Sequence, residues 1–162
     1  MLINKENHKV ITNYLHAVQR LLQKRKLILA LTKSSEVAMY WGSNGQHINQ
    51  FTQAASDFKL YLRGKHNTEG EYQLGDDKVK ELREIMSHVN IHINTIQPSM
   101  RKGKLNLIET LKNVNEAIGR FGFQDIIKTK VEDVDVALDL VAEIISLDIK
   151  VKDILEDVMI KS

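Results

Sequence analysis

A regular apolar stripe in the middle of the chain limits most strongly what this sequence can fold into. Leu82, Met86, Val89, Ile93 and Ile96 follow one another at spacings of four, three, four and three residues. This is the spacing that places side chains along one face of an α-helix and packs that face against another helix. The stretch therefore predicts a long amphipathic helix that requires a helical partner.

A proline follows this stripe, and a second stripe begins a few residues later. Pro98 has no backbone N–H and disfavours helical geometry in the residue before it, so we expect the first helix to end there. The same four-three spacing returns from Leu107 to Phe121. We therefore predict an antiparallel helical hairpin of residues 77–97 and 104–121, joined by a short polar loop.

Composition favours one all-α domain over residues 1–162. The chain has 162 residues, one proline and no cysteine, which excludes disulfides and thiolate metal sites. A chain of this length buries enough surface to fold without such bonds. We expect a bundle of about five to six helices around the central hairpin, with no bound cofactor. The longest apolar run, Leu27–Leu31, is far too short for a membrane span, so we expect a cytoplasmic protein.

The segments before the hairpin are predicted to be helical, with one loop. Apolar residues at helical spacing indicate a first helix from about Lys5 to Leu31. A second apolar stripe continues to Leu62, although Gly42–Gly45 interrupts it with a turn signal, so we expect a kink or a short break there. Glycine and polar residues from 64 to 75 predict a loop that is either mobile or functional.

The segments after the hairpin are predicted to contain two further helices. The alternating stretch Ile127–Val131 is compatible with an extended segment, and the helix that follows opens with Glu132 and Asp133. The apolar spacing is lost over Leu147–Lys152. A last short helix is expected after that break.

Charge is unevenly distributed along the chain. Residues 1–130 contain 20 Lys and Arg against 12 Asp and Glu, whereas residues 131–162 contain 3 against 9. Such asymmetry is found in nucleic-acid-binding proteins, and also wherever helix faces are simply solvated. The nucleic-acid hypothesis assigns phosphate contacts to basic groups. The candidate site residues are Lys24, Arg25, Lys26, Arg101, Lys102 and Lys104, and Lys128 with Lys130 forms a third basic group.

Two histidines offer a weak metal-binding pattern. His88 and His92 lie one helical turn apart, and Glu84 lies one turn before them. This spacing brings imidazole and carboxylate groups toward a single metal ion. All three fall on the flank and outer side of the apolar stripe, so ordinary surface histidines are the alternative.

Catalytic motifs are scarce, but two helices resemble those of a nucleotide-hydrolysing family. The stretch from Glu109 to Ala117, followed by Glu132 to Val136, resembles the helix layout of the MazG-type all-α nucleoside triphosphate pyrophosphatases. In that family carboxylates on two helices hold Mg²⁺. The resemblance implies Glu109, Glu132 and Asp135 as ligands, while Thr110 and Asn113 stand where the family has acids.

The acidic helix also resembles a second family. The stretch from Val131 to Val141 is similar to a helix in the small lid of AAA+ proteins such as the MCM helicases. The ATPase core of those proteins has no counterpart here, so the resemblance implies no ATPase activity.

The sequence thus leaves three functional hypotheses. The first is a non-enzymatic helical bundle that acts by protein–protein association, as a homo-oligomer or as a subunit of an assembly. The second is nucleic-acid binding through the basic groups. The third is a degenerate MazG-like pyrophosphatase that uses the three carboxylates.

Overall fold

The computed structural model describes residues 1–24, 45–69, 71–116 and 123–161, and these residues are almost entirely helical. The prediction of an all-α fold is confirmed. The described residues form four helices and two very short strands, so a bundle of five to six helices is not confirmed. The elements are β1 (Leu2–Ile3), α1 (Lys5–Gln23), α4 (Gly45–Glu69), β2 (Tyr72–Gln73), α5 (Asp76–Glu116) and α6 (Phe123–Lys161).

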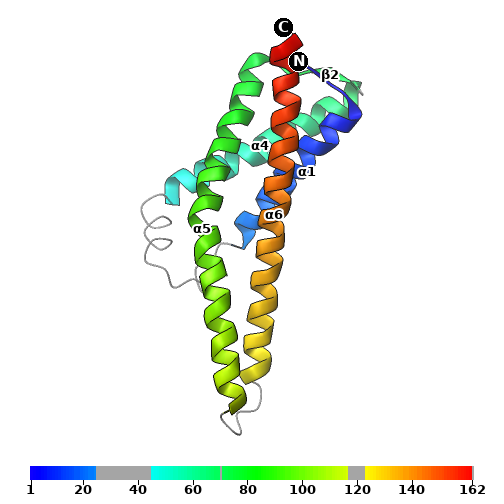
Figure 1. Ribbon diagram of the computed structural model, residues 1–162. Helices are drawn as coiled ribbons and strands as arrows, with labels where there is room; N and C mark the ends of the chain where they lie inside the picture. Colours follow the sequence, from blue (N-terminus) through cyan, green and yellow to red (C-terminus); the bar gives the residue numbers. More distant parts are fainter. Residues whose placement is uncertain (25–44, 70, 117–122, 162) are drawn as a thin grey trace.

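Two long antiparallel helices, α5 and α6, form the axis of the molecule (Figure 1). Helix α1 packs mainly on α6, and α4 packs on α1 and more lightly on α5. In Figure 1 these two shorter helices cover the upper part of the axis, and α5 and α6 continue below them as a pair. The two antiparallel helices at the centre are therefore α5 and α6, and the predicted central hairpin is not confirmed.

The predicted hairpin of residues 77–97 and 104–121 is wrong, because α5 runs without interruption through Pro98. The apolar spacing explains why. After Ile96 the sequence continues with Met100, Gly103 and Leu107 at steps of four, three and four residues, so the two stripes are one. Pro98 lies on the exposed side of α5, where water solvates the carbonyl that loses its N–H partner.

Helix α1 begins as predicted, at Lys5. The side chain of Asn4 caps it, since Asn4 Oδ1 accepts a hydrogen bond of 2.8 Å from the backbone N–H of Asn7. The helix ends at Gln23, with Lys24 as its C-cap. The rest of the predicted first helix, and most of the Gly42–Gly45 turn, lie outside the described residues.

The predicted loop over residues 64–75 is largely wrong. Helix α4 extends to Glu69, and β2 pairs antiparallel with β1, with Ile3 opposite Tyr72. Gly64 lies inside a helix, where a glycine costs only about 1 kcal/mol relative to alanine. Tyr72 and Leu74 are buried, so this segment is part of the core.

Two further predictions, the extended segment at 127–131 and the break at 147–152, are wrong, because both stretches lie within helix α6. It is continuous from Phe123 to Lys161. Its buried positions include Ile127, Val134, Val141 and Asp148, which are seven residues apart. The apparent break arose because a polar residue, Asp148, occupies a core position.

None of the helices within the described ranges combines the length and the apolar character that crossing a bilayer requires.

The continuity of α5 predicts that Pro98 lowers stability. Replacing Pro98 with alanine restores the hydrogen bond to the Asn94 carbonyl and removes a steric clash, so we expect the free energy of unfolding to rise by about 1–3 kcal/mol. Chemical denaturation followed by circular dichroism measures this change. Ser99→Ala, at the neighbouring position, should change stability by much less. A loss of stability in Pro98→Ala would contradict a continuous α5.

A second prediction concerns Tyr72, which joins β2 to α1. Its hydroxyl oxygen lies 2.6 Å from His8 Nδ1. Burial raises the pKa of Tyr72 to about 12, with a smaller contribution from Tyr61. An unfolded tyrosine loses its proton near pH 10, so from about pH 10 to 12 the folded state holds a proton that the unfolded state has lost. Stability should fall over that range, and less steeply in Tyr72→Phe. An identical slope in the variant would contradict this assignment.

Candidate functional site

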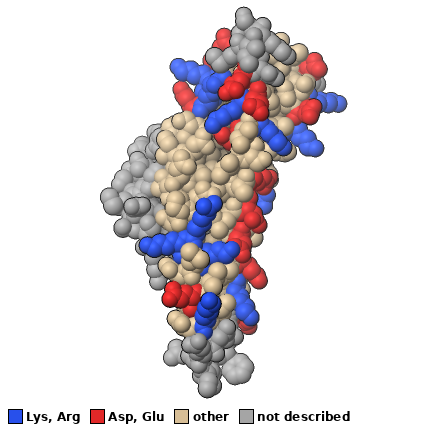
Figure 2. All heavy atoms as spheres, in the orientation of Figure 1, with Lys and Arg blue, Asp and Glu red and all other residues tan. Residues whose placement is uncertain are grey.

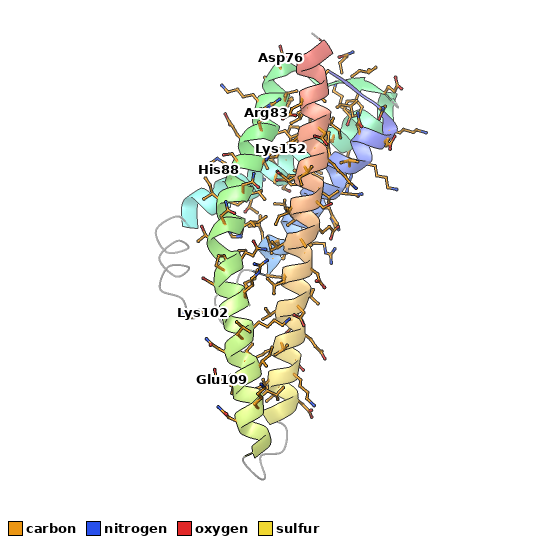
Figure 3. The ribbon with its side chains drawn as sticks, viewed as in Figure 1. Asp76, Arg83, His88, Lys102, Glu109 and Lys152 are labelled. Carbon is orange, nitrogen blue, oxygen red and sulfur yellow. The ribbon has the colours of Figure 1, made fainter. Side chains whose placement is uncertain are left out.

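The predicted carboxylate cluster does not assemble into a metal site. Asp135 forms an ion pair with Lys104 across the α5–α6 interface. Glu109 is exposed near the lower end of α5 (Figure 3), and Glu132 is exposed on α6. Within the described residues, no three His, Asp or Glu side chains are grouped so that they could hold a metal ion.

The two histidines contact an aromatic ring on α4. The His88 and Phe51 rings stack at a centroid distance of 5.9 Å, and His92 meets Phe51 edge-on at 6.1 Å. Figure 3 shows His88 on α5 beside α4. His92 is only 2% exposed, so placing it on the outer side of the stripe was wrong. The contacts assign both histidines to the packing of α4 on α5.

The predicted basic groups are only partly available for binding phosphate. Lys104 is paired with Asp135, while Arg101 and Lys102 are exposed on α5. Lys24 caps α1 and is half-buried. Arg25 and Lys26 lie outside the described residues. The nucleic-acid hypothesis remains a prediction that rests on fewer cations than the sequence indicated.

The lower parts of α5 and α6 form a two-helix arm, defined here as residues 101–116 and 123–138. In the α5 part of the arm, burial is described for residues 101–113. Of these residues only Gly103 is buried. By contrast, the upper part of α5 buries the stripe from Leu82 to Met100. The arm carries three strongly exposed apolar residues, Leu105 at 66%, Ile126 at 54% and Val136 at 46%.

The apolar stripe of α5 is therefore buried in its upper part and only partly buried in the arm. Above, α1 and α4 lie against the axis; below, Leu107 and Leu111 continue the stripe but remain half-buried. A pair of helices can bury only one face of each helix, and the helices of proteins depend on such burial for most of their stability.

Charge also separates across the arm. The α5 part carries four Lys and Arg against two Glu, and the α6 part carries four Asp and Glu against two Lys. Figure 2 shows acidic side chains along the α6 edge and basic side chains over α5 at a similar height. Within the arm, a net positive part of α5 therefore lies beside a net negative part of α6.

A groove lies between α5 and α6 above the arm. It has a volume of about 380 Å³. Its buried floor is formed by Met86 and Leu155, and most of its remaining lining is exposed. The lining comprises Arg83, Met86, Ser87, Asn90, Ile91, Asn94, Lys152 and Leu155. Sequence reasoning missed this groove because its residues come from helices whose pairing was not predicted.

A buried carboxylate fixes one wall of the groove. Asp148 is 6% exposed, and its Oδ2 lies 3.0 Å from Lys152 Nζ one turn further along α6. Its Oδ1 and the buried hydroxyl of Tyr14 make no hydrogen bond to any described residue. Burial, and secondarily the charge of Asp148, raises the pKa of Tyr14, so this phenol stays neutral.

Comparison with known proteins finds no matching family model, no matching curated protein and no matching solved structure. Function is therefore inferred from geometry and charge.

The Lys104–Asp135 contact makes a testable prediction. Both side chains are partly exposed, so their coupling should be small, at about 0.2–1 kcal/mol. A double-mutant cycle with Lys104→Gln and Asp135→Asn measures it, and the coupling should shrink in high salt because ions screen exposed pairs. Adding Mg²⁺ should leave the melting temperature of the unmodified protein unchanged. A rise in that temperature which Asp135→Asn abolishes would instead support a metal site.

Proposed function

We propose that this protein is a non-enzymatic helical bundle that acts by protein–protein association, with the α5–α6 arm as its interface and a second copy of the chain as its partner. The observation that carries the proposal is the exposure of Leu105, Ile126 and Val136 on an arm whose apolar stripe is only half-covered. A second arm would cover these exposed side chains.

The small size of the arm supports this proposal. Its two segments together span about 30 residues, which is below the size at which a chain usually folds without a disulfide, a metal or an oligomeric partner. The sequence has no cysteine, and the described residues hold no metal-binding group. Association would add stability to this arm by covering its exposed apolar side chains.

The charge pattern of the arm supports a second copy of the chain as the partner. Symmetric dimers place the same patch of each subunit against its own copy. Rotation by a twofold axis that lies between two arms, parallel to their helices, brings the basic α5 edge of one copy to the acidic α6 edge of the other. Opposite charges at the rim of such an interface favour this register over a shifted one.

The oligomeric state in solution tests the proposal. We expect sedimentation velocity to show dimers at roughly 10–100 µM protein. The triple variant Leu105→Gln, Ile126→Gln and Val136→Gln should weaken the dimer about tenfold or more, because each substitution removes apolar surface that the interface would bury. These side chains are exposed in the single chain, so its fold should be retained.

The matched control carries Leu2→Gln and Leu60→Gln. These two leucines are 54% and 59% exposed, and both lie outside the arm. The control should dimerise as the unmodified chain does. A chain that stays monomeric over the whole concentration range, or a control that weakens the dimer as much as the triple variant, contradicts the proposed interface.

A further inference from the structure

Helix α6 carries two apolar stripes, and only one of them is buried. The buried stripe includes Val134, Val141 and Val151. The second stripe follows spacings of four, three and four residues, and its members are Leu138, Ala142, Ile145 and Ile149. Ile145 is 39% exposed and Ile149 is 57% exposed. Such spacing is typical of a helix face that packs against another helix, so this second stripe has the pattern of a contact surface.

The second stripe lies on the side of the α5–α6 pair that faces away from α1 and α4. Ile149 is three residues and Ile145 is seven residues before Lys152, so both share its side of α6, and Lys152 lines the groove between α5 and α6. None of the described residues that line this groove belongs to α1 or α4. In Figure 1 these two helices pass behind the pair, and Figure 2 shows the face in front. The described helices therefore leave the second stripe uncovered.

The part of α5 beside this stripe carries no Asp, Glu, Lys or Arg over residues 86–100. The Lys104–Asp135 pair sets the register of the two antiparallel helices. Asn94 lies ten residues before Lys104 and Ile145 lies ten residues after Asp135, so both stand at about one level. Figure 2 shows an area without charged side chains over the middle of this face. We call this surface the uncharged face, and its members are Asn90, Ile91, Asn94, Ala142, Ile145 and Ile149.

The uncharged face continues without a break into the arm. Leu105 lies 11 residues after Asn94, which is about three helical turns, so both residues are on one side of α5. Leu138 lies seven residues before Ile145, which is about two turns of α6. Leu105 and Leu138 both belong to the arm. The exposed apolar surface of the arm and the uncharged face therefore form one continuous surface.

The arm alone is small for a stable dimer interface. Its 16 residues of α5 span about 24 Å, and two helices side by side are about 20 Å wide, which gives roughly 500 Å². Stable interfaces bury about 800 Å² on each partner. Residues 86–100 add about 22 Å of length and roughly 450 Å² of surface. The two surfaces together reach the area that a stable dimer needs, and the arm by itself does not.

The absence of charge on this face favours a second copy of the chain as the partner. Contacts around a twofold axis bring residues near the axis close to their own copies. A charged residue in such a position meets its own charge and is repelled. The uncharged face has no such residue, and an amide such as that of Asn94 both donates and accepts hydrogen bonds, so it is able to pair with its own copy.

We propose that the dimer interface extends from the arm onto the uncharged face, so that a second copy covers Ile145 and Ile149 together with the groove beside them. The inference rests on the proposed dimerisation through the arm and adds the surface that completes the interface. The twofold axis runs parallel to the helices, so Asn94 and Ile145 of both copies lie at one level. The isoleucines of the two copies are buried by the contact, and the amides of Asn90 and Asn94 form hydrogen bonds across it.

The reactivity of a single introduced cysteine tests the proposal, because the chain has no cysteine of its own. Three variants of the full chain are compared: Ile149→Cys on the uncharged face, Leu105→Cys on the arm and Leu60→Cys on α4. All three positions are more than half exposed in the single chain. The second-order rate constant for alkylation by N-ethylmaleimide is measured at roughly 1 µM and roughly 200 µM protein, below and above the range expected for dimers.

We expect the rate constants of Ile149→Cys and Leu105→Cys to fall about threefold or more at the higher concentration, because a thiol covered by a second copy reacts only when the dimer dissociates. Leu60→Cys is the matched control and should react equally at both concentrations. Protection of all three thiols would indicate unspecific aggregation and would contradict the proposal.

The pattern of protection separates this inference from the proposed function. Protection of Leu105→Cys alone would overturn the extension onto the uncharged face and would leave the arm as the interface. Protection of Ile149→Cys alone would exclude the arm and keep the second copy on the uncharged face. Protection of neither thiol would contradict both proposals and would leave the uncharged face to a different partner.

Substitution of the uncharged face gives an independent measurement. In sedimentation velocity, the double variant Ile145→Gln and Ile149→Gln should weaken the dimer about tenfold or more, because it removes apolar surface that the contact buries. The double variant Leu2→Gln and Leu60→Gln removes the same number of exposed apolar side chains elsewhere and should leave the dimer unchanged. An unchanged dimer in the Ile145 and Ile149 variant, with its helical circular dichroism intact, would overturn the inference.

Discussion

The packing of α5 against α6 along one uninterrupted apolar stripe is the interaction on which the rest of the structure depends. Helix α5 has 41 residues and is therefore about 60 Å long, far longer than the helices that cover it. Because α4 lies against α5, and α1 lies against α6, along the upper part of the pair alone, one stripe produces two environments (Figure 1). The upper part buries a core, and the lower part leaves Leu107 and Leu111 half-covered. The arm is thus a consequence of helix length.

The sequence was sufficient to predict the class of the fold and the stripe from Leu82 to Ile96, because helical spacing reports directly which face is buried. The predicted hairpin was misplaced because Pro98 was expected to end the helix. The regular spacing of apolar residues on both sides of Pro98 instead indicated one continuous helix. A proline on the exposed side of a long helix costs about 3 kcal/mol, and packing along the rest of α5 outweighs that cost. The break predicted over residues 147–152 has a similar origin. Asp148 is a polar residue in a core position, so it interrupts the apolar spacing without interrupting the helix.

The candidate sites were harder to predict, because the surroundings of each candidate residue depend on which helices pack against each other. Lys104 was assigned to phosphate binding and Asp135 to metal binding, yet the two side chains contact each other. The stacking of His88 and His92 on Phe51 depends on α4, whose position against α5 no local pattern reveals. The charge asymmetry between the two parts of the chain was visible in the sequence. The pairing of α5 and α6 was needed to see that, within the arm, a net positive part of α5 lies beside a net negative part of α6.

Asp148 connects the core to the groove between α5 and α6, because its carboxylate is buried and pairs with Lys152 in the groove wall. Burying a carboxylate carries a desolvation cost that one ion pair with an exposed lysine does not fully offset. Apolar residues at the same positions would be expected to fold at least as well. The pair is therefore poorly explained by stability. What the pair does is fix the position of the Lys152 side chain in the wall of the groove.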